Sequence, residues 1–342
     1  MSQPSPASPE ASAAPTLMKA VVARRYGSPE VLSLEEIPRP EPGPGEILVR
    51  IRAASVNAGD WHIMRGVPFA VRFFTGLTKP KFPIYGADLA GEVVATGEGA
   101  SDFQPGDAVF GDVSAHGFGG FAEYVCAPET AFVKKPENVD FATAAAAPAA
   151  GMTALQGLRK HGRLQPGERV LINGASGGVG SFAVQIAKAL GGEVTAVAST
   201  SKLEMLRSLG ADHVIDYTKE NFTENGQRYD VILAANGFQP ITAYRRALAK
   251  GGRYFMSGGE GKQLTQAMLL GPLLSLFDDR QLGNYLMTAT REDMETLRDL
   301  LADGKIAPVM DRRYPLPEVP AAVAYVEEGH ARGKVIIDVA GS

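Results

Sequence analysis

The sequence of 342 residues has one cysteine and no apolar run long enough to cross a membrane. Because Cys126 is the only cysteine, the chain cannot form an internal disulfide or a structural zinc site with several cysteine ligands. The nearest membrane candidate, Ala142 to Met152, is shorter than the roughly 18 residues of a spanning helix. Residues 1–16 are rich in Pro, Ser and Ala, without a basic start or apolar core, and predict a disordered leader rather than a signal peptide. We therefore expect a cytoplasmic protein without a membrane partner.

An excess of either charge is also missing. The chain has 34 Lys and Arg against 38 Asp and Glu, a formal net charge of −4. This balance argues against a nucleic-acid partner, which needs a basic surface. Hydrophobic residues make up 45% of the chain, enough for the cores of two ordinary domains.

Residues 17–140 consist of short β-type runs separated by turns rich in Gly and Pro. Short strands at this spacing predict a small all-β barrel. The expected strands include 19–23, 46–53, 91–95, 108–110 and 122–125.

From residue 141 the pattern changes to alternating strands and helices, which predicts a parallel sheet covered by helices on both faces. Pro148 lies inside a helix-forming run and predicts a helix break or start. We expect this second domain to span 141–305 and the strand-like end of 306–342 to rejoin the first. The expected strands are 170–173, 193–198, 214–216, 230–235 and 252–256, and the expected helices are 178–190, 202–209 and 242–250.

The segment Asn173–Ser181, NGASGGVGS, follows the first of these strands and opens a helix. It keeps the glycines that let the backbone approach a pyrophosphate, although Ala175 stands where the tight-turn glycine is expected. Phosphate oxygens would meet the N-terminus of the helix. The predicted dinucleotide loop is Ala175, Ser176, Gly177, Gly178, Val179 and Gly180.

The end of the second strand selects the dinucleotide. An acid there binds the ribose of NAD, whereas hydroxyls and cations accommodate the 2′-phosphate of NADP. The chain reads Ser199-Thr200-Ser201-Lys202 with no acid, and Glu193 starts the strand at its other end. This pattern favours NADPH. The alternative is an ordinary Ser-capped helix with an exposed lysine.

Several motifs in order over Met18 to Ala340 resemble the medium-chain dehydrogenase/reductase superfamily, in its zinc-free quinone oxidoreductase-like branch. The matching stretches are SVNAGD (55–60), PIYGAD (83–88), GEV (91–93), PGDAVF (105–110), AGMTA (150–154), the glycine loop, LGADHVIDYTKE and GHARGKVIIDV.

The resemblance implies an α/β fold with the active site between two domains. A GroES-like β-barrel catalytic domain would span 17–140, completed by 306–342, and a doubly wound parallel-sheet Rossmann domain would span 141–305. The resemblance also implies a homodimer joined through the Rossmann edge strand, which we expect near Tyr285-Leu286-Met287-Thr288.

The same resemblance adds residues to the cofactor site. Lys202 and Tyr217 match a Lys and a Tyr that contact the 2′-phosphate in NADPH-using relatives, and Thr153 matches a residue at the nicotinamide face. The predicted set is completed by Asn236, Ser257 and Lys334.

Zinc-dependent relatives have Cys where Asn57 stands and Gly-His-Glu where Gly86-Ala87-Asp88 stands. A catalytic zinc needs three protein ligands. Ala87 cannot act as a ligand and Asn57 is a poor one. We therefore predict no metal site and a zinc-independent enzyme.

Without a Lewis acid, a conjugated acceptor is easier to reduce than a simple ketone, because hydrogen bonds can stabilise its enolate-like oxygen. Asn57 is the candidate donor to that oxygen, with a turn-forming Asn as the alternative. His62 and Tyr85 are candidate proton donors, with structural roles, or solvent water as the donor, as the alternatives. Asp60 and Asp88 are expected to anchor turns.

The leading prediction is an NADPH-dependent oxidoreductase acting on the activated double bond of a small apolar enone, enal or quinone. The alternatives are a zinc-free carbonyl or alcohol oxidoreductase, an enoyl-thioester reductase and, in another class, a non-catalytic NADPH-binding protein. The apolar segment 66–82 is expected to wall a substrate pocket or to pack in the core. The stretch 268–277 is expected to line the cleft mouth or a subunit interface.

Overall fold

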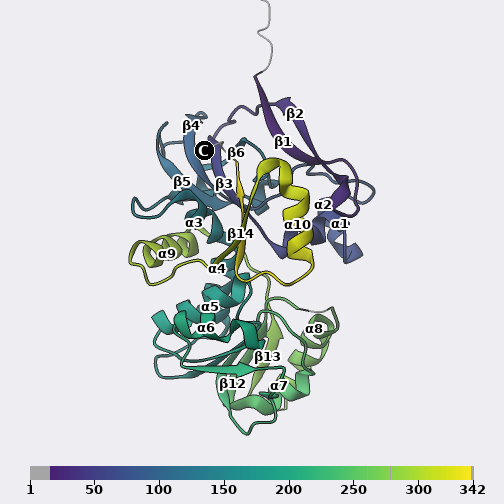
Figure 1. Cartoon of the computed structure of the whole chain (residues 1–342), viewed down its shortest axis with the longest axis vertical. Helices are drawn as coiled ribbons and strands as arrows, with labels where there is room; N and C mark the ends of the chain where they lie inside the picture. The colour runs from purple at the N-terminus through teal and green to yellow at the C-terminus, as the bar shows by residue number, and fades with distance from the viewer. Residues whose placement is uncertain (1–15, 260, 278, 340–342) are drawn as a thin grey trace, which may run out of the picture.

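The computed structural model describes residues 16–259, 261–277 and 279–339, which form two bodies joined near the middle of the molecule (Figure 1). The predicted leader therefore lies, apart from Thr16, outside the described residues. An antiparallel pair, β1 (Leu17–Ala23) and β2 (Leu32–Pro38), flanks the first body.

The first body is built on a seven-stranded sheet with the order β14-β15-β3-β4-β5-β7, and β6 also pairs with β3. Residue 335 pairs with residue 56, so the C-terminal strand returns to this body as KVIIDV predicts. Its core is rich in Val, Ile and Leu. The strands are β3 (Glu46–Val56), β4 (Asp88–Thr96), β5 (Ala108–Asp112), β6 (Tyr124–Pro128), β7 (Phe132–Lys134), β14 (Met310–Pro315) and β15 (Lys334–Asp338).

The second body is a parallel six-stranded sheet with the order β10-β9-β8-β11-β12-β13. The strand order reverses between β8 and β11, which opens a crevice at their carboxyl ends where nucleotides bind in such sheets. The strands predicted here are confirmed. They are β8 (Arg169–Asn173), β9 (Glu193–Ala198), β10 (His213–Asp216), β11 (Tyr229–Ala234) and β12 (Leu248–Met256), joined at the edge by β13 (Gln281–Asn284).

Helices cover both faces of this sheet, as predicted. Val170 and Ile172 of β8 pack in one buried cluster with Phe182 of α5, whereas Leu171 packs in another with Tyr244 of α7. Pro148 occupies the first turn of its helix, so the predicted helix start is confirmed. The helices of this body are α4 (Pro148–Leu155), α5 (Gly178–Ala189), α6 (Leu203–Ser208), α7 (Ile241–Ala247) and α8 (Gly261–Ser275), and α9 (Arg291–Ala302) packs against both α4 and β7. α1 (Ala58–Arg65), α2 (Arg72–Thr75), α3 (Phe141–Ala146) and α10 (Val319–Glu327) belong with the first body, where α3 contacts β3, β4 and β15.

The edge strand was predicted four residues too late. β13 spans Gln281–Asn284, and residues 285–288 form no strand. The Tyr285 hydroxyl donates to the Thr153 carbonyl at 2.6 Å, and the backbone of Thr288 is held by the Gln156 amide. Packing on α4 and the turn after it therefore competes with strand pairing at these positions. The homodimer stays a prediction, with β13 as the exposed edge.

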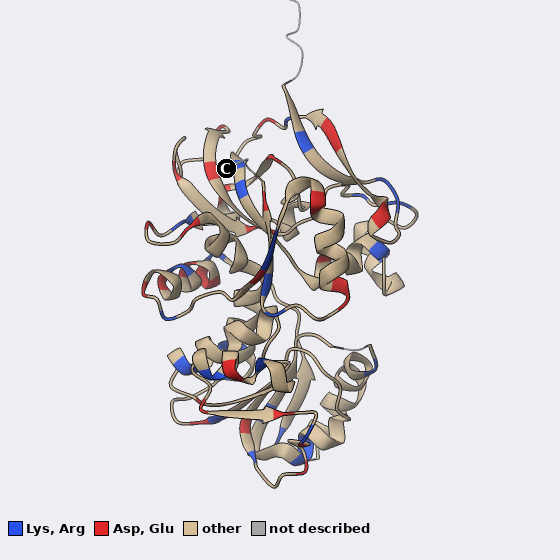
Figure 2. Cartoon of the chain, viewed as in Figure 1, with Lys and Arg blue, Asp and Glu red and all other residues tan. Residues whose placement is uncertain are grey.

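Figure 2 shows acidic and basic residues mixed along the ribbon of both bodies. No helix in the described part of the chain is long and apolar enough to cross a membrane.

Candidate functional site

The glycine loop joins β8 to α5 at the crevice. Gly177 precedes the first turn of α5, so the backbone N–H groups of that turn point toward the crevice. A Cβ at Gly180 would lie 2.2 Å from the carbonyl oxygen of Gly174, so only glycine allows the helix to approach the loop this closely. Ala175 is fully buried, and its N–H donates to the Val197 carbonyl at 3.1 Å. An alanine is accommodated because this residue packs inward.

A cleft of about 440 Å³ opens beside this loop at the carboxyl ends of the strands. Of the predicted cofactor residues, the cleft is lined by Ser176, Gly177, Ser199, Lys202, Tyr217 and Asn236. The volume and the position at the strand reversal suit a dinucleotide.

The hydroxyls after β9 differ in their roles. Ser199 lines the cleft, but the Thr200 hydroxyl donates to Asp216 at the end of β10. Hydrogen bonds from the hydroxyls of Thr200 and Thr218 lower the pKa of Asp216 to about 2, so this carboxyl group is ionised and both its oxygens already accept hydrogen bonds. Lys202 is half-buried beside the cleft, and burial lowers its pKa. The cleft thus offers the ammonium of Lys202 and the hydroxyl of Ser199 to a ligand. The carboxylate of Asp216 already accepts hydrogen bonds from neighbouring threonines.

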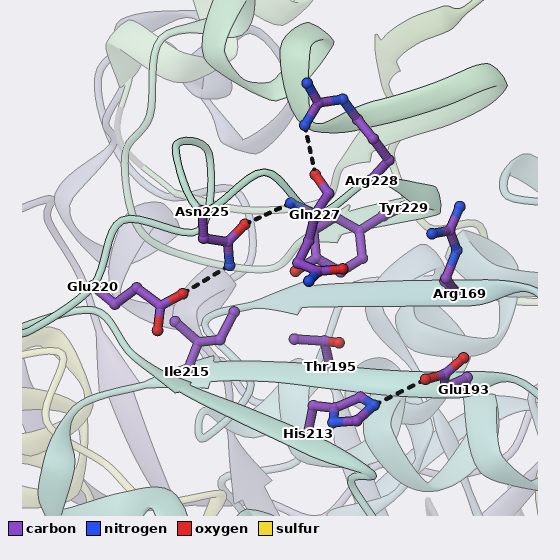
Figure 3. A pocket seen from close by; sticks show the side chains of 10 residues that line it. All are labelled: Arg169, Glu193, Thr195, His213, Ile215, Glu220, Asn225, Gln227, Arg228 and Tyr229. Atoms are coloured by element: carbon purple, nitrogen blue, oxygen red, sulfur yellow. Dashed lines mark hydrogen bonds and ion pairs between the residues drawn. The ribbon is translucent and has the colours of Figure 1, made fainter.

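A second cavity, of about 260 Å³, opens at the opposite edge of the same sheet (Figure 3). Its walls include Arg169, Glu193, His213 and Tyr229, the first residues of four parallel strands. Several of its polar groups satisfy one another: His213 contacts Glu193 at 2.8 Å, and Asn225 donates to Glu220 at 2.8 Å. Since nucleotides bind at the carboxyl edge, this cavity is not the dinucleotide site.

The first body contributes a buried polar hub centred on Asp88, at the start of β4. One carboxylate oxygen accepts hydrogen bonds from the Ser55 hydroxyl and the Asn57 amide, both at 2.9 Å. The other accepts from the backbone N–H of Ala149 in the first turn of α4 at 2.8 Å. Asp88 is fully buried. It was expected to anchor a turn, and instead it joins three segments.

Lys334, at the start of β15, connects this hub to the nucleotide loop. Its ammonium lies 3.2 Å from the Asp88 carboxylate and donates to the amide oxygen of Asn57. A Cβ at Gly178 would lie 3.3 Å from Cδ of Lys334, so the lysine stem passes the N-terminus of α5. The preceding N–H, of Gly333, donates to the Ser176 carbonyl at 3.0 Å. The predicted cofactor residue therefore also touches the predicted catalytic one.

These contacts fix the amide of Asn57 in one orientation. Its oxygen accepts from Lys334 and its nitrogen donates to Asp88, which leaves one N–H of the amide without either partner. Asn57 directly precedes α1, and Asp60 holds this turn as predicted: its carboxylate accepts from the N–H groups of Asn57 and Gly86.

Comparison with known proteins is consistent with this geometry. Residues 43–137 match the family model described as the alcohol dehydrogenase GroES-like domain, and residues 209–337 match the model described as zinc-binding dehydrogenase. The quinone-oxidoreductase QR1, chloroplastic, of Triphysaria versicolor is 35% identical over 336 residues, covering 94% of this chain and 98% of that protein. The chain belongs to the medium-chain dehydrogenase/reductase superfamily.

Two further comparisons place it in the quinone oxidoreductase-like branch. The NADPH-dependent alkenal/one oxidoreductase, chloroplastic, of Arabidopsis thaliana is 35% identical over 334 residues, covering 94% of this chain and 80% of that protein. The structure of the quinone oxidoreductase from Coxiella burnetii has a TM-score of 0.85 at 29% identity, covering 95% of this chain and 100% of that one. The chain is thus an oxidoreductase of this branch, and the predicted fold class is confirmed. The two plant relatives are named chloroplastic, so a cytoplasmic location stays a prediction.

This quinone oxidoreductase-like site holds more buried acid than base. Burial and the charge of Asp88 raise the pKa of Asp60 to about 7 and that of Asp112 to about 6. Asp112 lies opposite Asp88 in the β4–β5 pair, and one of its oxygens is buried with no described partner. Asp60 and Asp112 therefore keep their protons to a higher pH than ordinary carboxyl groups do, although the ammonium of Lys334 opposes this effect at both residues.

We expect Asp112→Asn to stabilise the protein above neutral pH. The pKa of Asp112 is higher in the folded chain than its ordinary value of 3.8, so its stabilising contribution is lost as the pH rises from about 4 to about 6. A neutral amide removes this loss, which is on the order of 3 kcal/mol at most. Urea unfolding at pH 4 and pH 8 measures the free energy of unfolding of the variant and of wild type. We expect the variant to be more stable than wild type only at pH 8. A gain that is equal at both pH values contradicts the assignment.

Asp60→Asn provides the matched control. Both Asp60 oxygens accept backbone N–H groups, and an amide offers only one acceptor in their place. At pH 4 this variant is expected to lose stability, because one of the two N–H groups is left without an acceptor, whereas Asp112→Asn is not.

Neither candidate proton donor forms a hydrogen bond with a described residue of the hub. His62 Nδ1 is 3.1 Å from the Val67 carbonyl, and the ring stacks on Trp61. A carbonyl only accepts, so Nδ1 carries the hydrogen, and burial lowers the pKa of His62. Tyr85 is buried in the core of the first body, its hydroxyl without a described partner, and burial raises its pKa.

The remaining predicted residues lie near the crevice. The Thr153 hydroxyl in α4 donates to the Ala149 carbonyl at 2.6 Å. Asn236 follows β11, and its side chain accepts from the N–H of Gly237 at 2.8 Å. Ser257 directly follows β12, and its N–H donates to the Ala234 carbonyl at 3.0 Å. The hub formed by Ser55, Asp88, Asp112 and the N–H of Ala149 was missed. Its only sequence signal was an acid, Asp88, in the stretch where zinc-dependent relatives have Gly-His-Glu.

Proposed function

We propose that this oxidoreductase uses NADPH to reduce the activated double bond of an enone, enal or quinone, without a metal ion. The observation that carries the proposal is the fixed amide of Asn57, linked through Lys334 to the nucleotide loop. Two relatives support it: the alkenal/one oxidoreductase described above and the 2-methylene-furan-3-one reductase of Solanum lycopersicum, 35% identical over 334 residues.

The residues at the crevice suit the cofactor. The open backbone at Gly177 and Gly178 would hold the pyrophosphate, and Ser199, Lys202 and Tyr217 would hold the 2′-phosphate. When bound, NADPH supplies hydride to the β-carbon of the acceptor.

The chain's own residues then stabilise charge. The free N–H of Asn57 donates to the acceptor oxygen and binds it more tightly as negative charge develops there. Lys334 and Asp88 prevent the amide from flipping, so no reorganisation is needed during the reaction. His62 is neutral and uses its Nδ1 hydrogen for Val67, so we assign the proton on the α-carbon to solvent water.

The donor set supports the proposed metal independence. Asn57 and Ala87 occupy two positions where zinc-dependent relatives have ligands, and the Asn57 amide is already bound to Lys334 and Asp88. The described residues contain no cluster of three His, Cys, Asp or Glu suited to a metal.

Lys202→Ala is expected to raise the KM for NADPH by about ten- to a hundredfold, because one charge-assisted contact to a phosphate is lost. The KM for NADH should stay nearly constant, since NADH lacks that phosphate. Steady-state kinetics with both cofactors measures the effect. An equal loss with both would make Lys202 structural and remove the basis for the NADPH preference.

A panel of acceptors tests the function itself. NADPH oxidation is followed with a quinone, an enone, an isolated ketone and crotonyl-CoA. We expect turnover with the first two. Turnover of the ketone alone would indicate a carbonyl reductase, turnover of the thioester alone an enoyl-thioester reductase, and no turnover a binding protein.

A further inference from the structure

A short segment after α1 exposes apolar side chains to water. Within residues 67–82, here called the aromatic segment, the exposed fractions are 61% for Phe69, 68% for Phe73, 81% for Phe74 and 56% for Leu77. It was expected to pack in the core or wall a pocket, and core packing is excluded by these exposures. α1, α2 and α10 lie together at one edge of the molecule in Figure 1.

Polar groups hold this segment from the inside. The Arg72 guanidinium donates to the Gly66 carbonyl and lies over the ring of Tyr26, 4.5 Å from its centroid. The Tyr26 hydroxyl bonds to the Gly76 carbonyl, and the buried Thr75 hydroxyl donates to the Val71 carbonyl. The phenylalanines are therefore directed outward by a fixed backbone, with the polar groups beneath them.

The charged residues of the segment and of its flanks in the sequence have one sign. Residues 61–87 contain four Lys and Arg and no Asp or Glu, although acids outnumber bases in the whole chain. Arg65 pairs with Glu327. Lys79 and Lys81 are exposed, and neither forms an ion pair with a described residue. The Lys81 ammonium lies over the ring of Phe82, 5.1 Å from its centroid. Two exposed cations without an acidic partner among the described residues thus accompany four exposed apolar side chains.

We propose that the aromatic segment docks the protein on an anionic lipid surface, with the phenylalanines and Leu77 in the headgroup region and Lys79 and Lys81 on the lipid phosphates. Outward aromatic groups flanked by lysines have the composition of segments that lie in a membrane interface. A second copy of the chain fits less well, because a twofold contact would bring the same cations together. Docking needs no spanning helix, and it replaces the expectation that the protein has no membrane partner.

The docked surface adjoins the site. α1 starts directly after Asn57 and ends at Arg65, before the aromatic segment begins. At 1.5 Å per residue, the helix spans about 12 Å. An apolar acceptor dissolved in the bilayer would thus reach the enzyme near the proposed donor, although docking itself does not depend on the reaction.

Co-sedimentation of the whole protein with vesicles tests the proposal. We expect binding to vesicles of phosphatidylcholine mixed with phosphatidylglycerol, weak binding to phosphatidylcholine alone, and release at about 1 M salt, where charges are screened within about 3 Å. Lys79→Gln with Lys81→Gln should weaken binding about thirtyfold, roughly fivefold for each cation. Phe73→Ser with Phe74→Ser should weaken it at least about tenfold.

Leu276→Ser with Phe277→Ser is the matched control, because these side chains are 79% and 75% exposed at the end of α8. This pair is expected to leave vesicle binding unchanged. Equal binding to both vesicle types, an equal loss in the control pair, or binding that survives the Phe73 and Phe74 substitutions overturns the proposal. In the last case, a changed solution mass would assign the segment to a second copy, and a changed KM for a water-soluble enone would assign it to the substrate pocket.

Discussion

Asn57→Ala is expected to lower kcat for an enone by about ten- to a thousandfold, the range for losing one donor to a developing oxyanion. The reason is the fixed geometry of the amide: Lys334 and Asp88 bind its other groups, and one N–H is left for the acceptor. Steady-state kinetics measures the change. Because this interaction strengthens only as charge develops, kcat should fall much more than the KM for the acceptor rises.

Two controls separate catalysis from damage to the fold. NADPH affinity should remain within a few-fold of wild type, since the loop that would hold it lies on β8 and α5. The free energy of unfolding should fall by no more than about 1–3 kcal/mol, the cost of removing one partner from buried polar groups, because Asp60 still caps the first turn of α1 through the backbone N–H of residue 57. A variant with unchanged kcat would remove Asn57 from the reaction.

Lys334→Met is expected to cost about 3–5 kcal/mol of stability at neutral pH, because it leaves the buried Asp88 carboxylate without its cation. Urea unfolding measures the loss. Activity should fall as well, because the Asn57 amide loses the group that holds its oxygen.

The double variant Asp88→Asn, Lys334→Met distinguishes the pair from ordinary packing. Both partners are then neutral, so the double variant should be more stable than Lys334→Met alone. Lys334→Arg retains the cation and should recover part of both stability and kcat. If the stability losses of Asp88→Asn and Lys334→Met simply add in the double variant, Lys334 and Asp88 do not stabilise each other, which contradicts the pairing in the hub.

The fold followed closely from the sequence because its signals are local. Turns rich in Gly and Pro divided the first body into strands, and Pro148 marked a helix start where the structure has one. The predicted position of the edge strand was wrong because Tyr285 and Thr288 have side-chain and backbone partners on α4 and the turn after it. Such a tertiary contact leaves no local pattern.

The polar hub shows what local patterns miss. Lys334 reaches Asp88 across 246 residues and Asn57 across 277. The sequence suggested Asn57 and Lys334 separately, one as a donor and the other as a cofactor residue. Only the return of β15 to β3 brings them together. Tyr85 shows the opposite case, because a residue inside the matching stretch 83–88 proved to be packed in the core.

The most direct test uses NADPH carrying deuterium at C4 of the nicotinamide and an enone as acceptor, with the product read by NMR. The account predicts deuterium on the β-carbon, a saturated C–C bond, an intact ketone and a solvent-derived hydrogen on the α-carbon. Deuterium on the carbinol carbon, with the double bond preserved, would make the protein a carbonyl reductase and contradict the account.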